Sequence, residues 1–329
     1  MSLPAVFGTD VPKGNYADLT TKGFELSVSW RDQFQLASKP FNYEVRFTLA
    51  DYQSTIDKYN NPEKKLGDDY YYEGMKVGEI WGYETEGFFT SQADIDSHAK
   101  QPYFYAGATA GQWLPGDIKF KDLNGDGVID YGNNTVDNPG DQKIIGNSEP
   151  RFIYGINLSG DWNNFFVSAF FQGVGKQDWW PGSEASYFWG MYNRPYNDMP
   201  KSHLGNIWTE ENPNTYFPRL RGYSSEEPYA ELNLKQTRYL QNIAYIRMKN
   251  IQLGYTLPKS FISKLRMQNA KVYVSGENLW SWSPFYKYSK DLDVEAVRGS
   301  DRDLTEGTSG NGYSYPILKS VSFGLSVTF

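Results

Sequence analysis

The residues between positions 122 and 130 have the types and spacing of a calcium-binding loop. Oxygen-bearing side chains stand at its first, third, fifth and ninth positions, with a glycine at the sixth and a backbone carbonyl at the seventh. The predicted ligands are Asp122, Asn124, Asp126, the carbonyl of Val128, and Asp130. A dense set of hard oxygen donors favours Ca²⁺ over Zn²⁺ or copper. We expect a structural calcium ion that pins this loop.

The twelfth position of the loop departs from the calcium pattern, because Asn133 replaces the usual bidentate glutamate. Asp137 or Asp141 could supply that ligand if residues 131–140 loop out. Asp141 is preferred because the apolar pair Ile144 and Ile145 follows it. The alternative is an Asn/Asp/Gly turn that holds no metal.

Large aromatic side chains are a second group that could bind a ligand, by stacking on sugar rings or by gripping a peptide. The candidates are Trp81, Trp179, Trp180, Trp189 and Tyr192. They lie in segments that the strand pattern leaves as loops. Because long loops need internal packing to stay ordered, packing is the favoured role for most of these residues taken singly.

Catalytic chemistry has little support in the sequence. The chain has 329 residues, no cysteine, two histidines and a formal net charge of −7. The absence of cysteine excludes disulfides, thiolate metal sites and a cysteine nucleophile. The two histidines, His98 and His203, are far apart in the sequence, so we do not expect a histidine-based metal site. The acidic net charge argues against a nucleic-acid partner. Adjacent glutamates at 210–211 and 226–227 fix no separation between carboxylates, so we predict that the chain is not an enzyme.

The elements that must position these residues are strands, because apolar and polar side chains alternate with a period of two. The alternating segments are 24–31, 41–49, 152–159, 165–172, 243–257, 270–279 and 320–329. Within 243–257 the apolar parity changes, and a β-bulge near Asn250 would reconcile its two halves. The fold class is therefore all-β and antiparallel.

Short and long connections alternate along the chain. The short ones are 32–40, 160–164 and 258–269, and the long ones are 51–151, 174–242 and 280–314. Transmembrane β-barrels have this rhythm, since one rim carries tight turns and the other large extracellular loops. The polar parity, with Glu25, Arg31, Glu44 and Arg46, would then face a wet lumen. Alternation alone is equally typical of a soluble sandwich; the loop rhythm favours the barrel.

Aromatic residues at strand ends fit the same interpretation. Trp30, Phe41, Trp162, Tyr255 and Phe329 lie at or near the short-turn rim, where amphipathic rings suit the headgroup region. Ordinary strand packing is the alternative, because aromatic residues favour strands. No apolar run approaches the roughly 20 residues that a membrane helix needs.

Several longer motifs resemble the SusC/RagA family of TonB-dependent outer-membrane transporters. They are residues 78–83, 86–89, 115–129, 145–157, 245–258 and 272–279. The chain end, with Ser322, Gly324, Val327 and Phe329, is similar to the C-terminal signal by which outer-membrane barrels are recognised for assembly. The resemblance covers the chain from about residue 15 onward.

The resemblance implies a 22-stranded barrel with an N-terminal plug, in the outer membrane of a Gram-negative bacterium. Such transporters import oligosaccharides or peptides, are driven by TonB, and are capped by a SusD-like surface lipoprotein. Residues 1–329 would form the C-terminal part of one such barrel domain, without the plug and the N-terminal strands. The alternative function is a soluble calcium-binding β-sandwich that recognises carbohydrate.

Overall fold

Seven antiparallel strands form the main sheet of this computed structural model, in the order β1-β2-β7-β8-β11-β12-β13. The structure describes residues 17–67, 70–102, 113–183, 185–194, 196–221, 225–226, 230–297, 312 and 315–329. The strands are β1 (Asp18–Leu36), β2 (Lys39–Lys58), β7 (Arg151–Trp162), β8 (Phe165–Lys176), β11 (Tyr245–Thr256), β12 (Asn269–Trp282) and β13 (Ser320–Thr328). Neighbours in the sheet follow chain order, so the sheet is an up-and-down meander.

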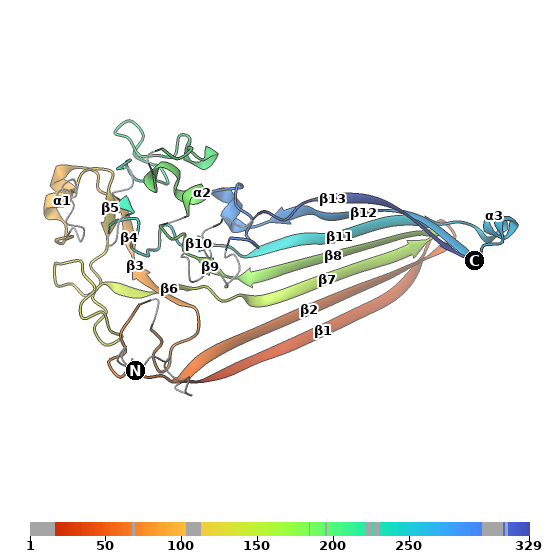
Figure 1. Ribbon diagram of the computed structural model, residues 1–329, viewed down its shortest axis with the longest axis horizontal. Helices are drawn as coiled ribbons and strands as arrows, with labels where there is room; N and C mark the ends of the chain where they lie inside the picture. Colours follow the sequence, from red (N-terminus) through yellow and green to blue (C-terminus); the bar gives the residue numbers. More distant parts are fainter. Residues whose placement is uncertain are drawn as a thin grey trace, which may run out of the picture.

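Tight connections join the strands at one end of the sheet. Ala37 and Ser38 have φ of 47° and 62°, and Asn163 and Asn164 have φ of 49° and 70°. Left-handed residues in pairs suit two-residue hairpins, whose twist then matches that of the strands. The third connection holds α3 (Lys259–Ile262) and the 3₁₀ helix η5 (Ser263–Leu265). Figure 1 shows α3 and the C-terminus at this end.

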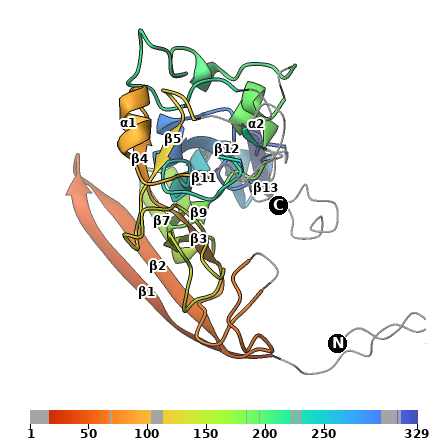
Figure 2. The same ribbon diagram turned by 90° about the vertical axis from the view of Figure 1, so that its left-hand side faces the viewer.

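The long connections carry most of the smaller elements, at the other end of the sheet (Figures 1 and 2). Between β2 and β7 lie β3 (Glu79–Tyr83), β4 (Thr85–Phe88), α1 (Gln92–Ser97), β5 (Ile118–Phe120) and β6 (Gln142–Asn147). Between β8 and β11 lie β9 (Asp178–Trp179), α2 (Ser186–Trp189), η2 (Gly190–Tyr192), η3 (Lys201–His203) and β10 (Gln241–Asn242). The 3₁₀ helix η6 (Pro284–Lys287) follows β12. The pairs β3–β6, β4–β5 and β9–β10 form small sheets.

The predicted two faces of the main sheet are confirmed by the strand register. Val28 pairs with Phe47 on the apolar parity, and Arg31 pairs with Glu44 on the polar parity. Arg31 Nε lies 2.9 Å from Glu44 Oε2, so opposite charges meet directly across the strands. A register shift between Met248 and Asn250 confirms the predicted bulge. The apolar side chains of β1 and β13 are largely exposed.

Several strands extend further than the sequence indicated. The first hairpin continues through residues predicted as connections, from Asp18 to Leu36 and from Lys39 to Lys58, because its backbone hydrogen bonds pair the two strands along their whole length. The connecting turn is therefore only Ala37–Ser38. As a result Trp30 lies six residues inside the strand end and not at the short-turn rim. Trp162 does lie at that rim, where its indole N–H donates to the Leu36 carbonyl at 2.9 Å.

The largest hydrophobic core lies mainly in the long connections, and Val174 of β8 and Tyr245 of β11 are its members from the main sheet. Some of its buried rings pack edge to face, as in Phe188 and Trp189 with centroids 4.8 Å apart, and others are stacked, as in Tyr192 and Phe217 with centroids 5.8 Å apart. Other fully buried members include Tyr239 and Phe285. The connections thus form an ordered layer with its own packing.

The main sheet is open among the residues that the structure describes, since β1 and β13 each pair on one side only. In the same residues the other sheets have two strands each, so no second large sheet covers the apolar face as a sandwich would require. No helix in the described part of the chain is long and apolar enough to cross a membrane.

Candidate functional site

The acidic loop from Asp122 to Asp130 is folded around its own backbone N–H groups. Asp122 accepts hydrogen bonds from the N–H groups of Gly125 at 2.6 Å and Gly127 at 2.9 Å. Asn124 and Asp126 each accept from the N–H two residues ahead, at 2.9 Å and 2.8 Å. Gly125 and Gly127 have φ of 78° and 84°, which side-chain-bearing residues rarely adopt. The sequence spacing therefore produces a tight turn of converging oxygens.

Asp141 closes this loop. Its side chain is fully buried and accepts from the N–H groups of Leu123 at 2.7 Å and Asp130 at 2.8 Å. Asp137, the other candidate for this position, is exposed. Asp141 stands directly before β6, so the strand fixes its position relative to the loop.

The loop oxygens fit calcium in type, but the carboxylates do not form a metal cluster by themselves. Among the described residues, no group of three or more His, Cys, Asp or Glu side chains is arranged to hold a metal ion. A calcium ion at this loop would need the Asn124 amide and the Val128 carbonyl beside the carboxylates of Asp122, Asp126, Asp130 and Asp141. Calcium binding stays a prediction.

Three of the five aromatic candidates lie inside the loop core. Trp179, Trp189 and Tyr192 are buried, and the Trp189 indole N–H donates to the Pro181 carbonyl at 3.1 Å. The Tyr192 hydroxyl donates to the Pro218 carbonyl at 2.5 Å. Trp180 is partly buried and packs 6.2 Å from Trp189. In this conformation these rings pack against other side chains, which is the role that the sequence analysis favoured for most of the aromatic candidates.

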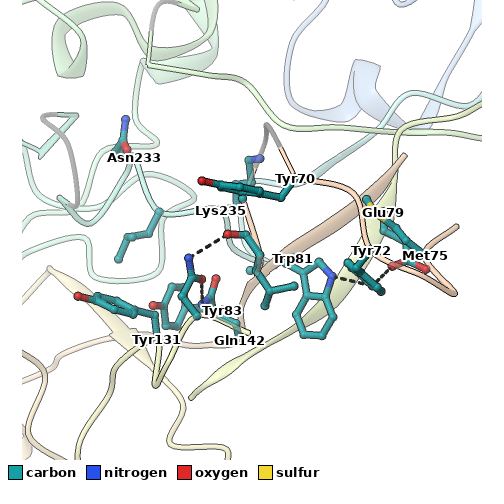
Figure 3. Close-up of a pocket in the computed structure, with 15 residues that line it drawn as sticks. Tyr70, Tyr72, Met75, Glu79, Trp81, Tyr83, Tyr131, Gln142, Asn233 and Lys235 are labelled. Carbon is teal, nitrogen blue, oxygen red and sulfur yellow. Dashed lines mark hydrogen bonds between the residues drawn. The ribbon is translucent and has the colours of Figure 1, made fainter. Parts of the chain in front are cut away.

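Trp81 is the aromatic candidate that lines a pocket. The pocket has a volume of about 360 Å³, and the residues that line it belong to 66–67, 70–83, 131–142 and 233–235 in the long connections. Figure 3 shows Tyr72, Met75 and Glu79 grouped near Trp81, with Tyr131 and Asn233 at the other side. Two separate connections therefore contribute to one cavity.

Close approach of two backbones brings these stretches together. Tyr83 N–H donates to the Lys235 carbonyl at 2.8 Å, and Thr237 N–H donates to the Tyr83 carbonyl at 3.0 Å. A Cβ at Gly82 would lie 2.4 Å from the Lys235 carbonyl oxygen, so only glycine permits this contact. On the other side of β3, Tyr83 pairs with Gln142 in β6.

Trp81 is oriented by a short hydrogen-bond chain. Its indole N–H donates to the Tyr72 hydroxyl at 3.3 Å, and that hydroxyl donates to Glu79. Burial, together with the hydrogen bond to Glu79, raises the pKa of Tyr72 well above its usual range, so the hydroxyl stays protonated at neutral pH. The indole ring is thereby held in place.

The rest of the lining is mostly polar, with amide side chains beside the aromatic rings. Gln142 donates to the Asn134 side chain at 3.3 Å, and Asn134 donates to the Leu66 carbonyl at 2.9 Å. Asn233 and Lys235 add further polar groups from the second connection. Aromatic faces beside amide groups can stack on a sugar ring or hold a peptide backbone. Among the described lining residues the one carboxylate is Glu79, which is engaged with Tyr72.

The sequence analysis named Trp81 as a candidate but did not name most of the residues that line the pocket with it. The run of tyrosines at 70–72 was a visible signal, and Tyr131 directly follows the acidic loop. Asn233 and Lys235 carried no signal, because they are about 150 residues away from Trp81 along the chain and meet it only through the β3 contact.

Comparisons with known proteins agree with the strand pattern. No protein-family model matches the sequence. TonB-dependent receptor P3 of Formosa agariphila is 26% identical over 345 residues, covering 99% of this chain and 30% of the receptor. TonB-dependent receptor P26 of the same organism is 26% identical over 346 residues, covering 100% of this chain and 31% of the receptor. The chain therefore spans less than a third of the length of these relatives.

Solved structures of a peptide transporter have the same fold. A structure of the RagAB peptide transporter matches with a TM-score of 0.64 at 18% identity, covering 99% of this chain and 31% of that one. The RagAB peptide importer in the "closed-closed" state gives a TM-score of 0.62 at 17% identity, with the same coverage. The resemblance to SusC/RagA-type TonB-dependent transporters that the motifs indicated is confirmed over the whole chain, and the sheet has the fold of part of their barrel.

Proposed function

We propose that this chain forms the C-terminal part of the barrel wall, with its surface loops, of an outer-membrane TonB-dependent importer of SusC/RagA type in a Gram-negative bacterium. The observation that carries the proposal is the seven-stranded meander, with tight turns at one end and ordered long loops at the other, in a chain similar to TonB-dependent receptors throughout its length. These relatives are receptors and transporters and not enzymes, in agreement with the prediction that the chain has no catalytic role.

Strand dimensions support a membrane-spanning wall. β7, β8 and β11 have 12 residues each. At about 3.3 Å per residue and a tilt of about 45°, such a strand spans roughly 28 Å, close to the ~25 Å apolar band of outer-membrane barrels. Exposed apolar side chains on one parity would then face lipid, which accounts for their exposure in the isolated chain.

The topology can be tested with single cysteines, because the chain has none of its own. In the receptor that contains this chain, Asp137→Cys lies in a long loop and Lys264→Cys in a short connection. We expect a membrane-impermeant maleimide to label Asp137→Cys on intact cells and Lys264→Cys only after lysis, with the unsubstituted receptor as the blank. Equal labelling of both positions on intact cells would contradict the proposed topology.

The Trp81 pocket supports a role in contacting the imported oligosaccharide or peptide. RagAB is a peptide transporter by name, and the pocket chemistry suits either substrate class. Purified receptor should bind one class of ligand more weakly after Trp81→Ala, while Trp180→Ala, a ring outside the pocket, should leave affinity unchanged. Titrations with a panel of oligosaccharides and of peptides would identify the class. Equal losses in the two variants would remove the pocket from substrate binding.

Two protein partners follow from the proposal. TonB would act through a part of the receptor outside this chain, and a SusD-like surface lipoprotein would sit on the long loops. The exposed side chains of Tyr196, Met199 and Leu204 give one loop an apolar surface for such a partner. The double substitution Tyr196→Ser and Leu204→Ser should reduce co-purification of the lipoprotein, whereas Phe261→Ser, at an exposed apolar residue of α3 at the opposite end of the sheet, should not.

Calcium is proposed as a structural ion at the acidic loop, held by Asp122, Asn124, Asp126, Val128, Asp130 and Asp141. Its support is the hard oxygen set and the burial of Asp141 against both ends of the loop. When bound, the ion would neutralise neighbouring carboxylates and pin the connection between β5 and β6. Calorimetric titration of EDTA-treated protein should give calcium heat that Asp122→Ala abolishes. If calcium gives no heat with the unsubstituted protein, the proposal is wrong and the loop is a turn that holds no metal.

A further inference from the structure

We propose that a basic recess at the loop end of β12 and β13 binds the phosphate of an outer-leaflet lipid headgroup. The recess has a volume of about 770 Å³ and lies between the end of β12, η6 and the start of β13. This inference rests on the proposed membrane placement, but it concerns a site distinct from the Trp81 pocket.

The charge of the recess is strongly positive. Lys287 and Lys290 lie in the segment that follows β12, and Lys319 is the residue directly before β13. All three are exposed, and no carboxylate lines the recess among the residues that the structure describes. Three ammonium groups gathered in one recess attract an anion of more than one negative charge, such as a phosphate.

Trp282 places the recess at the outward, lipid-facing side of the sheet. It pairs with Ile246, and Trp280 pairs with Met248, whose partner in β8 is Phe171. Phe171 belongs to the apolar parity, so both tryptophans point outward, and 55% of Trp282 is exposed. Tryptophan at such a position is typical of the membrane–water interface.

The height of Trp282 along the strand agrees with that interface. Ten residues separate it from Val272, which is exposed on the same parity near the short-turn end. At about 3.3 Å per residue this is roughly 33 Å along the strand. A strand tilted by about 45° needs about 35 Å to cross an apolar band of ~25 Å. The lysines therefore stand where the headgroups of the outer leaflet would lie.

Apolar side chains beside the lysines favour a lipid over a soluble anion. Leu318 and Val321, on either side of Lys319, are 67% and 60% exposed. An acyl chain can cover these groups and Trp282 while the phosphate meets the ammonium groups, a combination that a free phosphate ion does not offer. Basic residues near a membrane surface act in this way on anionic lipids.

The test uses the receptor that contains this chain, purified in a neutral detergent and titrated with short-chain phosphatidic acid or short-chain phosphatidylcholine. Native mass spectrometry counts the bound lipid. We expect selective binding of phosphatidic acid, with a loss on the order of a hundredfold in K287Q/K290Q/K319Q. The matched variant K22Q/K259Q/K264Q, which removes three exposed lysines elsewhere, should bind as the unsubstituted receptor does. The charge-conserving variant K287R/K290R/K319R should retain binding.

Three results would overturn the inference: equal binding of phosphatidylcholine, equal affinity in the two lysine variants, or equally tight binding of inorganic phosphate. Tryptophan quenching by brominated phosphatidic acid, which Trp282→Phe should reduce, reports the location independently. Cell fractionation of the same variants separates this inference from the proposed function. If the receptor is found in the outer membrane but binds the two lipids equally, the lipid-site inference is wrong and the proposed function still stands.

Discussion

Asp130 and Asp141 are joined by two hydrogen bonds, one through a side chain and one through the backbone. The Asp130 N–H donates to the Asp141 carboxylate at 2.8 Å, and the Asp141 N–H donates to the Asp130 carbonyl at 2.9 Å. The last residue of the acidic loop is thereby fixed to the residue directly before β6. This contact connects the predicted calcium loop to β3 and, through it, to the wall of the Trp81 pocket.

Asp141→Ala should loosen the acidic loop. The change removes the acceptor of two backbone N–H groups, Leu123 and Asp130, and a buried unsatisfied donor costs about 1–3 kcal/mol. Amide hydrogen exchange at Leu123 and Asp130 should accelerate, with little change in the main sheet. Asp137→Ala, at an exposed side chain close by, is the control and should exchange as the unsubstituted protein does. Equal protection in both variants would show that Asp141 does not hold the loop.

The stability of the loop core should fall as pH rises towards 8. Glu231 is buried beside Asp117, and its carboxylate accepts from Ile118 N–H at 3.1 Å. Burial, with a further contribution from the charge of Asp117, raises the pKa of Glu231 from 4.5 to about 8, against the opposing effect of Arg221. The folded state therefore binds this proton more tightly than the unfolded state, and the free energy of unfolding decreases between these two pH values.

Glu231→Gln isolates that effect. A glutamine oxygen can still accept from Ile118, but it has no proton to lose, so a slope of up to about 1.4 kcal/mol per pH unit should disappear. Hydrogen exchange of residues 114–120 and 230–236, measured from pH 5 to pH 8, checks this. An unchanged slope in the variant would assign the pH dependence to other groups.

Gly324→Ala should destabilise the last strand pair. Gly324 lies directly opposite Tyr273, and a Cβ there would stand 2.1 Å from the tyrosine ring. The ring covers its glycine partner, as Phe166 covers Gly254. Overpacking of this kind costs about 1–3 kcal/mol. Heat-modifiable gel mobility measures the loss, Ser322→Ala is the control, and Tyr273→Ala combined with Gly324→Ala should relieve the clash.

Tyr72→Phe should weaken ligand binding in the Trp81 pocket. The change removes the hydroxyl that accepts from Trp81 and donates to Glu79, so the indole ring loses its fixed orientation. Loss of about one hydrogen bond predicts an affinity decrease of roughly five- to tenfold. Tryptophan fluorescence during ligand titration is the measurement. Tyr71→Phe, outside the pocket lining, should leave affinity unchanged, and an equal effect there would argue against the hydrogen-bond chain.

The strands of the main sheet could be predicted from local sequence patterns. Alternation at segments such as 41–49 identified the strands and their apolar parity, and the change of parity in 243–257 located the bulge at Asn250. These features follow from the two-residue period of a strand, which is a property of neighbouring residues. The ends of the strands could not be predicted as well. Residues 51–58 extend β2 because they pair with residues 18–24, and their own composition does not indicate a strand.

The acidic loop was readable in the same way, since its ligand types stand at fixed spacing within nine residues. Asp141 could be named from the sequence because it precedes the apolar pair Ile144 and Ile145, although which of the two aspartates is buried required the packing of β6.

Only the tertiary structure decided which aromatic rings pack and which line a cavity. Trp189 and Trp81 look alike in sequence, each within an aromatic-rich loop, yet one is fully buried and the other borders open space. The difference arises from contacts between distant segments, such as Tyr83 with Lys235 and Trp189 with Tyr239. The same holds for Lys287 and Lys319, whose charges add up only because β12 and β13 lie side by side. The spacing of neighbouring residues in the sequence determines the strand periodicity and the turns. The burial of a side chain and the grouping of charges depend on residues that are close in space but distant in the sequence.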